Sequence, residues 1–88
     1  MDTLELYRAA QGWLAEGQPR EAVRLLDLAA EREPGDPAVH RLLALALFRF
    51  AALGRAEALA RELVASDAAD VVEALLLART LQRRGRPE

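Results

Sequence analysis

Several residue types are missing or scarce in this sequence of 88 residues. It contains no cysteine, isoleucine, asparagine or lysine, and it has one serine, one tryptophan, one tyrosine and two phenylalanines. The absence of cysteine excludes disulfide bonds and thiol chemistry. It is also compatible with a reducing compartment, so we expect a cytoplasmic protein.

Residues that favour β-strands are scarce as well. Hydrophobic residues make up 52% of the chain, but most of them are leucine and alanine, which favour helices over strands. A chain of 88 residues has room for one domain with a thin core. We therefore expect a single all-α domain without a sheet.

Positive charge is not in excess. The formal net charge is -2, so the molecule has no overall cationic field that would attract nucleic acid or an anionic membrane. We therefore expect no nucleic-acid partner. All 12 basic residues are arginine, which together with the excess of alanine and leucine is typical of a GC-rich bacterial genome.

Long hydrophobic runs are also missing. The longest apolar segment, residues 42–53, is interrupted by Arg49 and is shorter than the ~20 residues that a membrane-spanning helix requires. The first residues include Asp2 and Glu5 and show no basic region followed by an apolar stretch. We expect a soluble protein without a signal peptide or a membrane partner.

Motifs that support catalysis are absent from the sequence. It has no metal-ligand spacing, no glycine-rich phosphate loop and no nucleophile beside a base. We expect the single histidine, His40, to serve packing. The basic cluster Arg83, Arg84 and Arg86 is better explained by the negative end of a helix than by a phosphate site. We predict no enzymatic activity, no cofactor and no metal.

The chain repeats itself with a period of 34 residues. In step with this period are Ala10, Ala44 and Ala78, then Trp13, Leu47 and Leu81, and also Gly17 and Gly85. A period of this length is typical of arrays of helical hairpins. Each unit of such an array must stack on its neighbours to bury its apolar face.

Capping signals and glycines divide the chain into five predicted helices. The expected helices run from Thr3 to about Glu16, from Pro19 to about Glu33, from Pro37 to Leu53, from Ala56 to about Ser66, and from the cap Asp70 to about Arg84. Asp2 with Glu5, and Asp70 with Glu73, have the spacing of a capping box. The short connections favour antiparallel packing of consecutive helices.

The middle of the chain departs from the period. Gly54 lies three residues later than the period predicts, and Ala58 and Ala65 fit the small positions only with a shift of two residues. We interpret this as a third helix lengthened by about one turn, followed by a shortened fourth helix.

The spacing of large and small apolar residues resembles that of the tetratricopeptide repeat family. The matching residues are Leu6, Ala9, Ala10 and Trp13, then His40, Leu43, Ala44 and Leu47, then Ala74, Leu77, Ala78 and Leu81, with Ala22, Leu26 and Ala29 in the second helix and Pro34 closing the first unit. The resemblance covers the chain as one repeat over about 3–36, a second over about 37–70 and a partial third over about 71–88. It implies a right-handed helical-hairpin solenoid with five antiparallel helices.

This resemblance also implies a protein interaction scaffold in which the first helix of each unit lines a concave groove. The groove positions are Tyr7, Gln11, Ala38, Arg41, Leu42, Leu45, Phe48, Arg49, Val72, Leu76, Arg79 and Arg83. We expect Arg41, Arg79 and Arg83 to be the charged anchors. One subfamily holds a terminal carboxylate with lysine and asparagine, and this chain has neither residue type.

The aromatic side chains have two interpretations. They could anchor a partner, because aromatic residues dominate the energetics of many interfaces. We expect Trp13 instead to fill the core, since it takes the inter-helix position of the repeat. For Phe48 and Phe50 both interpretations stay open.

The last predicted helix is apolar around much of its circumference, and no sixth helix follows to cover it. We expect it to form a homodimer through Val72, Leu75 and Leu76. The alternative is that the chain is a fragment of a longer array whose continuation begins at Pro87.

The function that we expect is that of a non-catalytic adaptor, which binds a protein or peptide partner through the groove. A purely structural homo-oligomerisation module without a peptide ligand is the alternative. An accessory nucleic-acid binder acting through Arg79, Arg83, Arg84 and Arg86 ranks last.

Overall fold

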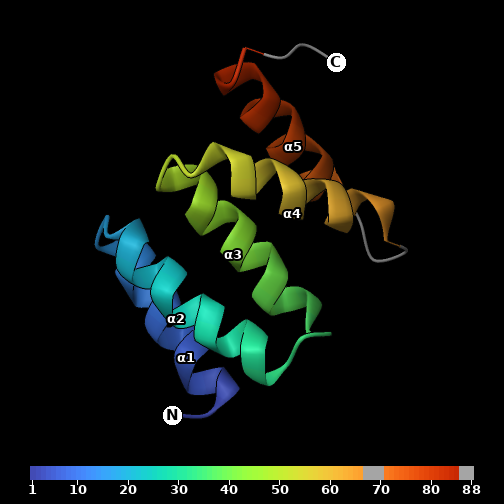
Figure 1. Cartoon of the computed structure of the whole chain (residues 1–88). Helices are drawn as coiled ribbons and strands as arrows, with labels where there is room; N and C mark the ends of the chain where they lie inside the picture. The colour runs from blue at the N-terminus through green and yellow to red at the C-terminus, as the bar shows by residue number, and fades with distance from the viewer. Residues whose placement is uncertain (67–70, 86–88) are drawn as a thin grey trace.

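Five helices follow one another along the chain in the computed structural model, which describes residues 1–66 and 71–85 and, for residues 71–73, the backbone alone. They are α1 (Thr3–Ala15), α2 (Pro19–Arg32), α3 (Pro37–Arg49), α4 (Leu53–Ala65) and α5 (Val71–Arg83) (Figure 1). The described residues form no strand. The all-α class and the number of helices predicted from the sequence are therefore confirmed.

Capping side chains begin two of the helices as expected. The Asp2 carboxylate accepts a hydrogen bond of 2.8 Å from the backbone N–H of Glu5, and the Glu5 carboxylate accepts one from the N–H of Asp2. Asp36 accepts from the N–H groups of Ala38 and Val39 at the start of α3. The predicted capping box of Asp70 and Glu73 lies outside the described residues.

The third helix is not lengthened, and this prediction was wrong. It ends at Arg49, and Ala51 has a φ of 62°, the left-handed conformation that Gly17 and Gly85 adopt at φ values of 74° and 72°. Gly17, Ala51 and Gly85 are 34 residues apart. Alanine here occupies the glycine position of the repeat, so the period continues unbroken.

The same hydrogen bonds close the ends of α1 and α3. The N–H of Gln18 donates to the carbonyl of Trp13, and the N–H of Ala52 donates to that of Leu47 at 2.9 Å. With the bond from the preceding N–H, this is the Schellman arrangement, which pairs the last carbonyls of a helix. The position of this turn is therefore set by the repeat even without glycine.

The fourth helix begins earlier than predicted. It starts at Leu53, so Gly54 lies inside its first turn instead of ending the helix before it. Ala56 and Ala60 are completely buried, whereas Ala58 and Ala65 are exposed. Without a shift, Ala56 and Leu63 take the positions of Ala22 and Ala29, and both are buried. The interpretation based on Ala58 and Ala65 was therefore wrong.

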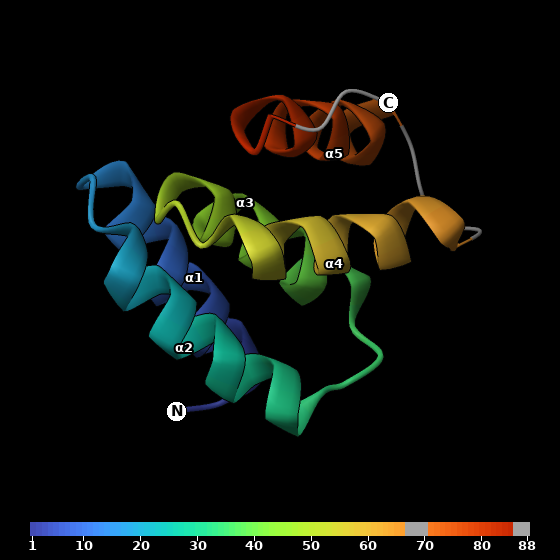
Figure 2. The same ribbon diagram turned by 45° about the horizontal axis from the view of Figure 1, so that its top comes forward.

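Each helix packs on the one before it, so the hairpins stack in sequence order (Figures 1 and 2). α3 lies between α2 and α4, and α5 packs on α4 and, less extensively, on α3. The main hydrophobic core joins α1, α2, α3 and the start of α4. A smaller cluster of Ala60, Leu77 and Leu81 joins α4 to α5.

Equivalent residues in the three units differ in exposure according to their neighbours. Leu47 and Leu81 are 1% and 3% exposed, since α2 covers α3 and α4 covers α5, whereas the equivalent Trp13 is 40% exposed. The expectation that Trp13 fills the core was therefore wrong, because no described helix packs on that side of α1. Conversely, Ala10 and Ala44 are buried, but Ala78 on α5 is exposed.

None of the described helices has the length and apolar character that would let it cross a membrane.

Candidate binding groove

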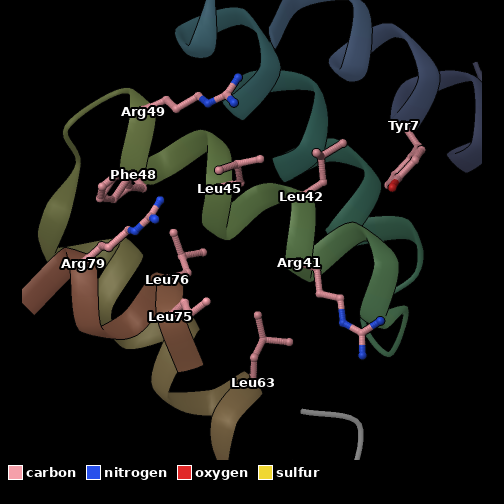
Figure 3. A pocket seen from close by; sticks show the side chains of 10 residues that line it. All are labelled: Tyr7, Arg41, Leu42, Leu45, Phe48, Arg49, Leu63, Leu75, Leu76 and Arg79. Atoms are coloured by element: carbon pink, nitrogen blue, oxygen red, sulfur yellow. The ribbon is translucent and has the colours of Figure 1, made fainter. Parts of the chain in front are cut away.

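One groove collects side chains from four helices. It encloses about 560 Å³, and its lining residues are Tyr7 of α1, Arg41, Leu42, Leu45, Phe48 and Arg49 of α3, Leu63 of α4, and Leu75, Leu76 and Arg79 of α5 (Figure 3). In Figure 3 the side chains of α3 run along the middle, with Tyr7 on one side and those of α5 on the other. The groove therefore spans all three units of the repeat.

The period of the sequence explains why these side chains meet. Tyr7, Arg41 and Leu75 are 34 residues apart, and so are Leu45 and Arg79. Because α1, α3 and α5 occupy equivalent places in successive units, residues in step with the period face the same side. The groove is thus a row of equivalent positions carrying different side chains.

Aliphatic side chains form the floor. They are Leu42 and Leu45 from α3, Leu63 from α4, and Leu75 and Leu76 from α5. Leu63 is buried, whereas Leu75 is 53% exposed to solvent. An exposed leucine beside other leucines gives apolar surface that a ligand can cover, at about 25 cal/mol per Å² removed from water.

Phe48 is held in place by Arg83. The guanidinium carbon of Arg83 lies 4.7 Å from the centroid of the Phe48 ring, and its Nη1 donates a hydrogen bond of 3.1 Å to the Phe48 carbonyl. Stacking of a cation on an aromatic ring is favourable by about 0.5–1 kcal/mol at exposed sites. Arg83 therefore fixes an aromatic wall of the groove and ties α5 to the end of α3.

The described lining carries positive charge without a carboxylate, since it includes Arg41, Arg49 and Arg79 but no aspartate or glutamate. Several arginines outside the groove form ion pairs with acidic residues. These ion pairs include Arg24–Glu21 at 3.0 Å, Arg55–Asp27 at 2.8 Å, Arg61–Glu57 at 3.1 Å and Arg84–Glu57 at 2.8 Å. The hydrogen bonds that Arg55 donates to Asp27 raise the pKa of its guanidinium, with partial burial acting in the opposite direction.

The structure brings together most of the side chains that the sequence placed in the groove. Tyr7, Arg41, Leu42, Leu45, Phe48, Arg49, Leu76 and Arg79 line it. Gln11 is exposed and does not line it, and neither does Ala38. Arg83 lies behind Phe48 rather than among the lining residues.

Two lining residues, Leu63 and Leu75, were not anticipated for the groove. Leu63 belongs to a second helix of a unit and is in step with Ala29, so its larger size at a small position was a usable signal. Leu75 and Leu76, expected at a self-association surface, both line the groove. The side chain of Val72, the third residue of that surface, lies outside the described residues.

A second recess lies between α2, α3 and α4. His40 is partly buried there, in a recess that it shares with Asp27, Glu31, Arg55 and Glu62. Phe50, the other phenylalanine, is exposed outside the groove. Among residues 1–66 and 71–85, no three histidine, aspartate or glutamate side chains are grouped so that they could hold a metal ion.

Comparison with known proteins identifies the repeat. A family model described as Tetratricopeptide repeat matches residues 14–80, from the end of α1 to the last part of α5. Neither the curated proteins nor the solved structures include a significant match. Repeats of this family generally mediate protein–protein interactions and are typically not catalytic. Since the match extends over most of the chain and agrees with the stacked hairpins, this chain belongs to the tetratricopeptide repeat family.

Proposed function

We propose that this chain is a non-catalytic adaptor that binds a protein or peptide partner in the concave groove. The observation that supports this most directly is the convergence of Tyr7, Leu45, Phe48 and Arg79 from three units on one partly apolar surface. A surface built from separate units of a stack suits a ligand that lies across several helices.

The composition of the groove agrees with a macromolecular ligand. Its lining has an aromatic wall, an aliphatic floor and arginines, and these residue types are enriched where binding energy concentrates in protein interfaces. The groove is also open to solvent along one side, where Leu75 is exposed. An extended peptide or a helix therefore fits it better than an enclosed small molecule.

The proposal can be tested by selecting peptides on the purified protein and locating where they bind. Selected peptides should lose binding to the variant Arg41→Glu plus Arg79→Glu, because these substitutions reverse two charges in the groove. They should retain binding to Arg20→Glu plus Arg24→Glu, which makes the same change on exposed residues of α2. If both variants lose peptide binding equally, or both retain it equally, the peptides do not bind in the groove and the proposal is wrong.

A second candidate is self-association through α5. Leu75 is 53% exposed, and Ala74 and Ala78 beside it are exposed as well, so this face of α5 is not covered by any described helix. Small exposed side chains allow another helix to approach closely. In this case the role of the module is to join two copies of the chain.

Sedimentation of the purified chain distinguishes the two candidates. If α5 pairs with a second copy, we expect a dimer at tens of micromolar, and Leu75→Glu should give a folded monomer. A well-folded monomer of the unmodified chain at that concentration rules out the dimer and leaves the groove proposal unaffected.

A further inference from the structure

The positive charge of the groove stands in contrast to the rest of the molecule. The chain has a net charge of -2 with 14 acidic residues, yet Arg49 and Arg79 line the groove and no aspartate or glutamate is among its described lining residues. In a partly desolvated cleft, charges of one sign concentrate the local potential. A ligand of the opposite sign is therefore favoured at this surface, even though the molecule as a whole is acidic.

Arg49 and Arg79 are the groove arginines whose guanidinium groups are available to bind a ligand. They come from α3 and α5, and in Figure 3 Arg79 extends toward Phe48 and Leu45, whereas Arg49 extends from the end of α3. Both are exposed, and neither forms an ion pair or a hydrogen bond with a described residue. By contrast, Arg83 is already used to hold Phe48.

Apolar surface lies directly beside these two cations. Leu45 and Leu76 line the groove next to Arg49 and Arg79, and Phe48 forms the wall between them (Figure 3). A matching ligand must therefore present an anion and an aliphatic or aromatic side chain together. Acidic protein segments offer both, whereas a nucleic-acid strand offers a regular phosphate backbone without aliphatic side chains.

We infer that the groove binds a protein segment in which acidic and large apolar residues are close together. This inference rests on the proposed function and specifies its partner. Aspartate or glutamate side chains of the segment pair with Arg49 and Arg79, whose guanidinium groups donate to carboxylates. A neighbouring apolar side chain covers Leu45 and Leu76 and contacts the ring of Phe48.

The first experiment compares four labelled nine-residue peptides by fluorescence anisotropy. In the test peptide glutamate and leucine alternate, and the others replace glutamate by glutamine, glutamate by lysine, or leucine by serine. We expect the test peptide to bind at least about tenfold more tightly than each of the others, because each control removes one of the two required features. Its affinity should also fall as salt is added.

The second experiment assigns the effect to the two arginines. Arg49→Gln and Arg79→Gln should each weaken the test peptide about threefold to fivefold, and the double variant about tenfold or more. The double variant Arg20→Gln plus Arg24→Gln on α2 removes the same charge and should leave the affinity unchanged. Circular dichroism of each variant establishes that the helices are intact.

The outcomes separate this inference from the function on which it rests. If peptides bind and Leu45→Ser weakens them, but the Arg49 and Arg79 substitutions have no effect, the acidic partner is wrong and groove binding stands. If neither Leu45→Ser nor the arginine substitutions affect binding, both are wrong. Tighter binding of a single-stranded oligonucleotide than of the test peptide, lost in the double arginine variant, would also overturn the inference.

Discussion

At the scale of single residues, Ala51 stands where the repeat requires a left-handed backbone conformation that alanine disfavours. Its φ of 62° is a left-handed conformation, which costs an alanine roughly 1–2 kcal/mol and costs glycine almost nothing. The equivalent residues Gly17 and Gly85 carry no such strain. The fold tolerates this cost because the surrounding turn pairs the last carbonyls of α3.

We predict that Ala51→Gly stabilises the protein. The relief of strain exceeds the extra entropy that glycine gives the unfolded chain, so the free energy of unfolding should rise by about 0.5–1 kcal/mol. Urea denaturation measures this change. Ala58→Gly, at an exposed position inside α4, is the control and should lower stability by about 1 kcal/mol. Destabilisation by both substitutions would contradict the prediction.

Trp13 and Leu47 are equivalent in the repeat but differ in exposure, at 40% and 1%. We predict that Leu47→Ala costs about 2–5 kcal/mol, because it leaves a cavity in the core. Trp13→Ala should cost about 1 kcal/mol, because part of the indole is already in water. Chemical denaturation of the two variants tests this contrast, and equal losses would mean that Trp13 is buried in solution.

At the scale of the helices, the turn between α2 and α3 depends on one cap. Asp36 accepts from the N–H of Ala38 at 2.9 Å, and these N–H groups have no other partner within the helix. We predict that Asp36→Ala lowers the free energy of unfolding by about 1 kcal/mol. Asp36→Asn, which keeps a capping oxygen, should retain most of the stability in the same thermal denaturation series. Equal loss in both variants would show that the oxygen is not responsible.

Helix starts that carry a capping residue or proline were easier to predict than the boundary between α3 and α4. Asp2, Pro19 and Asp36 mark helix starts through local chemistry that the sequence displays directly. The end of α3 was missed because alanine rarely adopts a left-handed conformation, so the nearby Gly54 was a more plausible break than Ala51. Only the 34-residue period, followed strictly, indicates the correct position.

Predicting the groove had similar limits. Arg41, Leu45 and Arg79 follow from the resemblance to the repeat family, which implies that these positions of each first helix face the groove, and all three line it. The exposure of Trp13 and the part that Leu63 plays depend on which helices lie nearby, and that is a property of the assembled stack. The stacking of Arg83 on Phe48, across 35 positions of sequence, depends on it as well.

At the scale of the whole molecule, the buried apolar contacts that hold the helices together are distributed unevenly. The main core joins α1 to α4, while α5 is attached through the small cluster of Ala60, Leu77 and Leu81. Polar contacts between described residues add to it, namely the ion pair of Arg84 with Glu57 at 2.8 Å and the hydrogen bond from Arg83 to Phe48. Stacked repeats are stabilised by contacts between neighbours, so a helix with one main neighbour opens most easily.

We predict that α5 opens before the rest of the molecule unfolds. Native-state hydrogen exchange should give the amides of α5 a lower opening free energy than the protected amides of α2 and α3. Glu57→Gln should lower the value for α5 by about 1 kcal/mol or less and leave α2 nearly unchanged, because the pair is only partly buried. Identical opening free energies in all helices would contradict this prediction.

Since α5 supplies Leu75, Leu76 and Arg79 to the groove, the recognition surface exists only while this loosely attached helix is docked. A bound partner would hold α5 against the rest of the stack. Because the partner binds only the docked form, any population of undocked α5 weakens its apparent affinity. Substitutions far from the groove, at Ala60 or Arg84, could therefore adjust how tightly the partner is held without touching it.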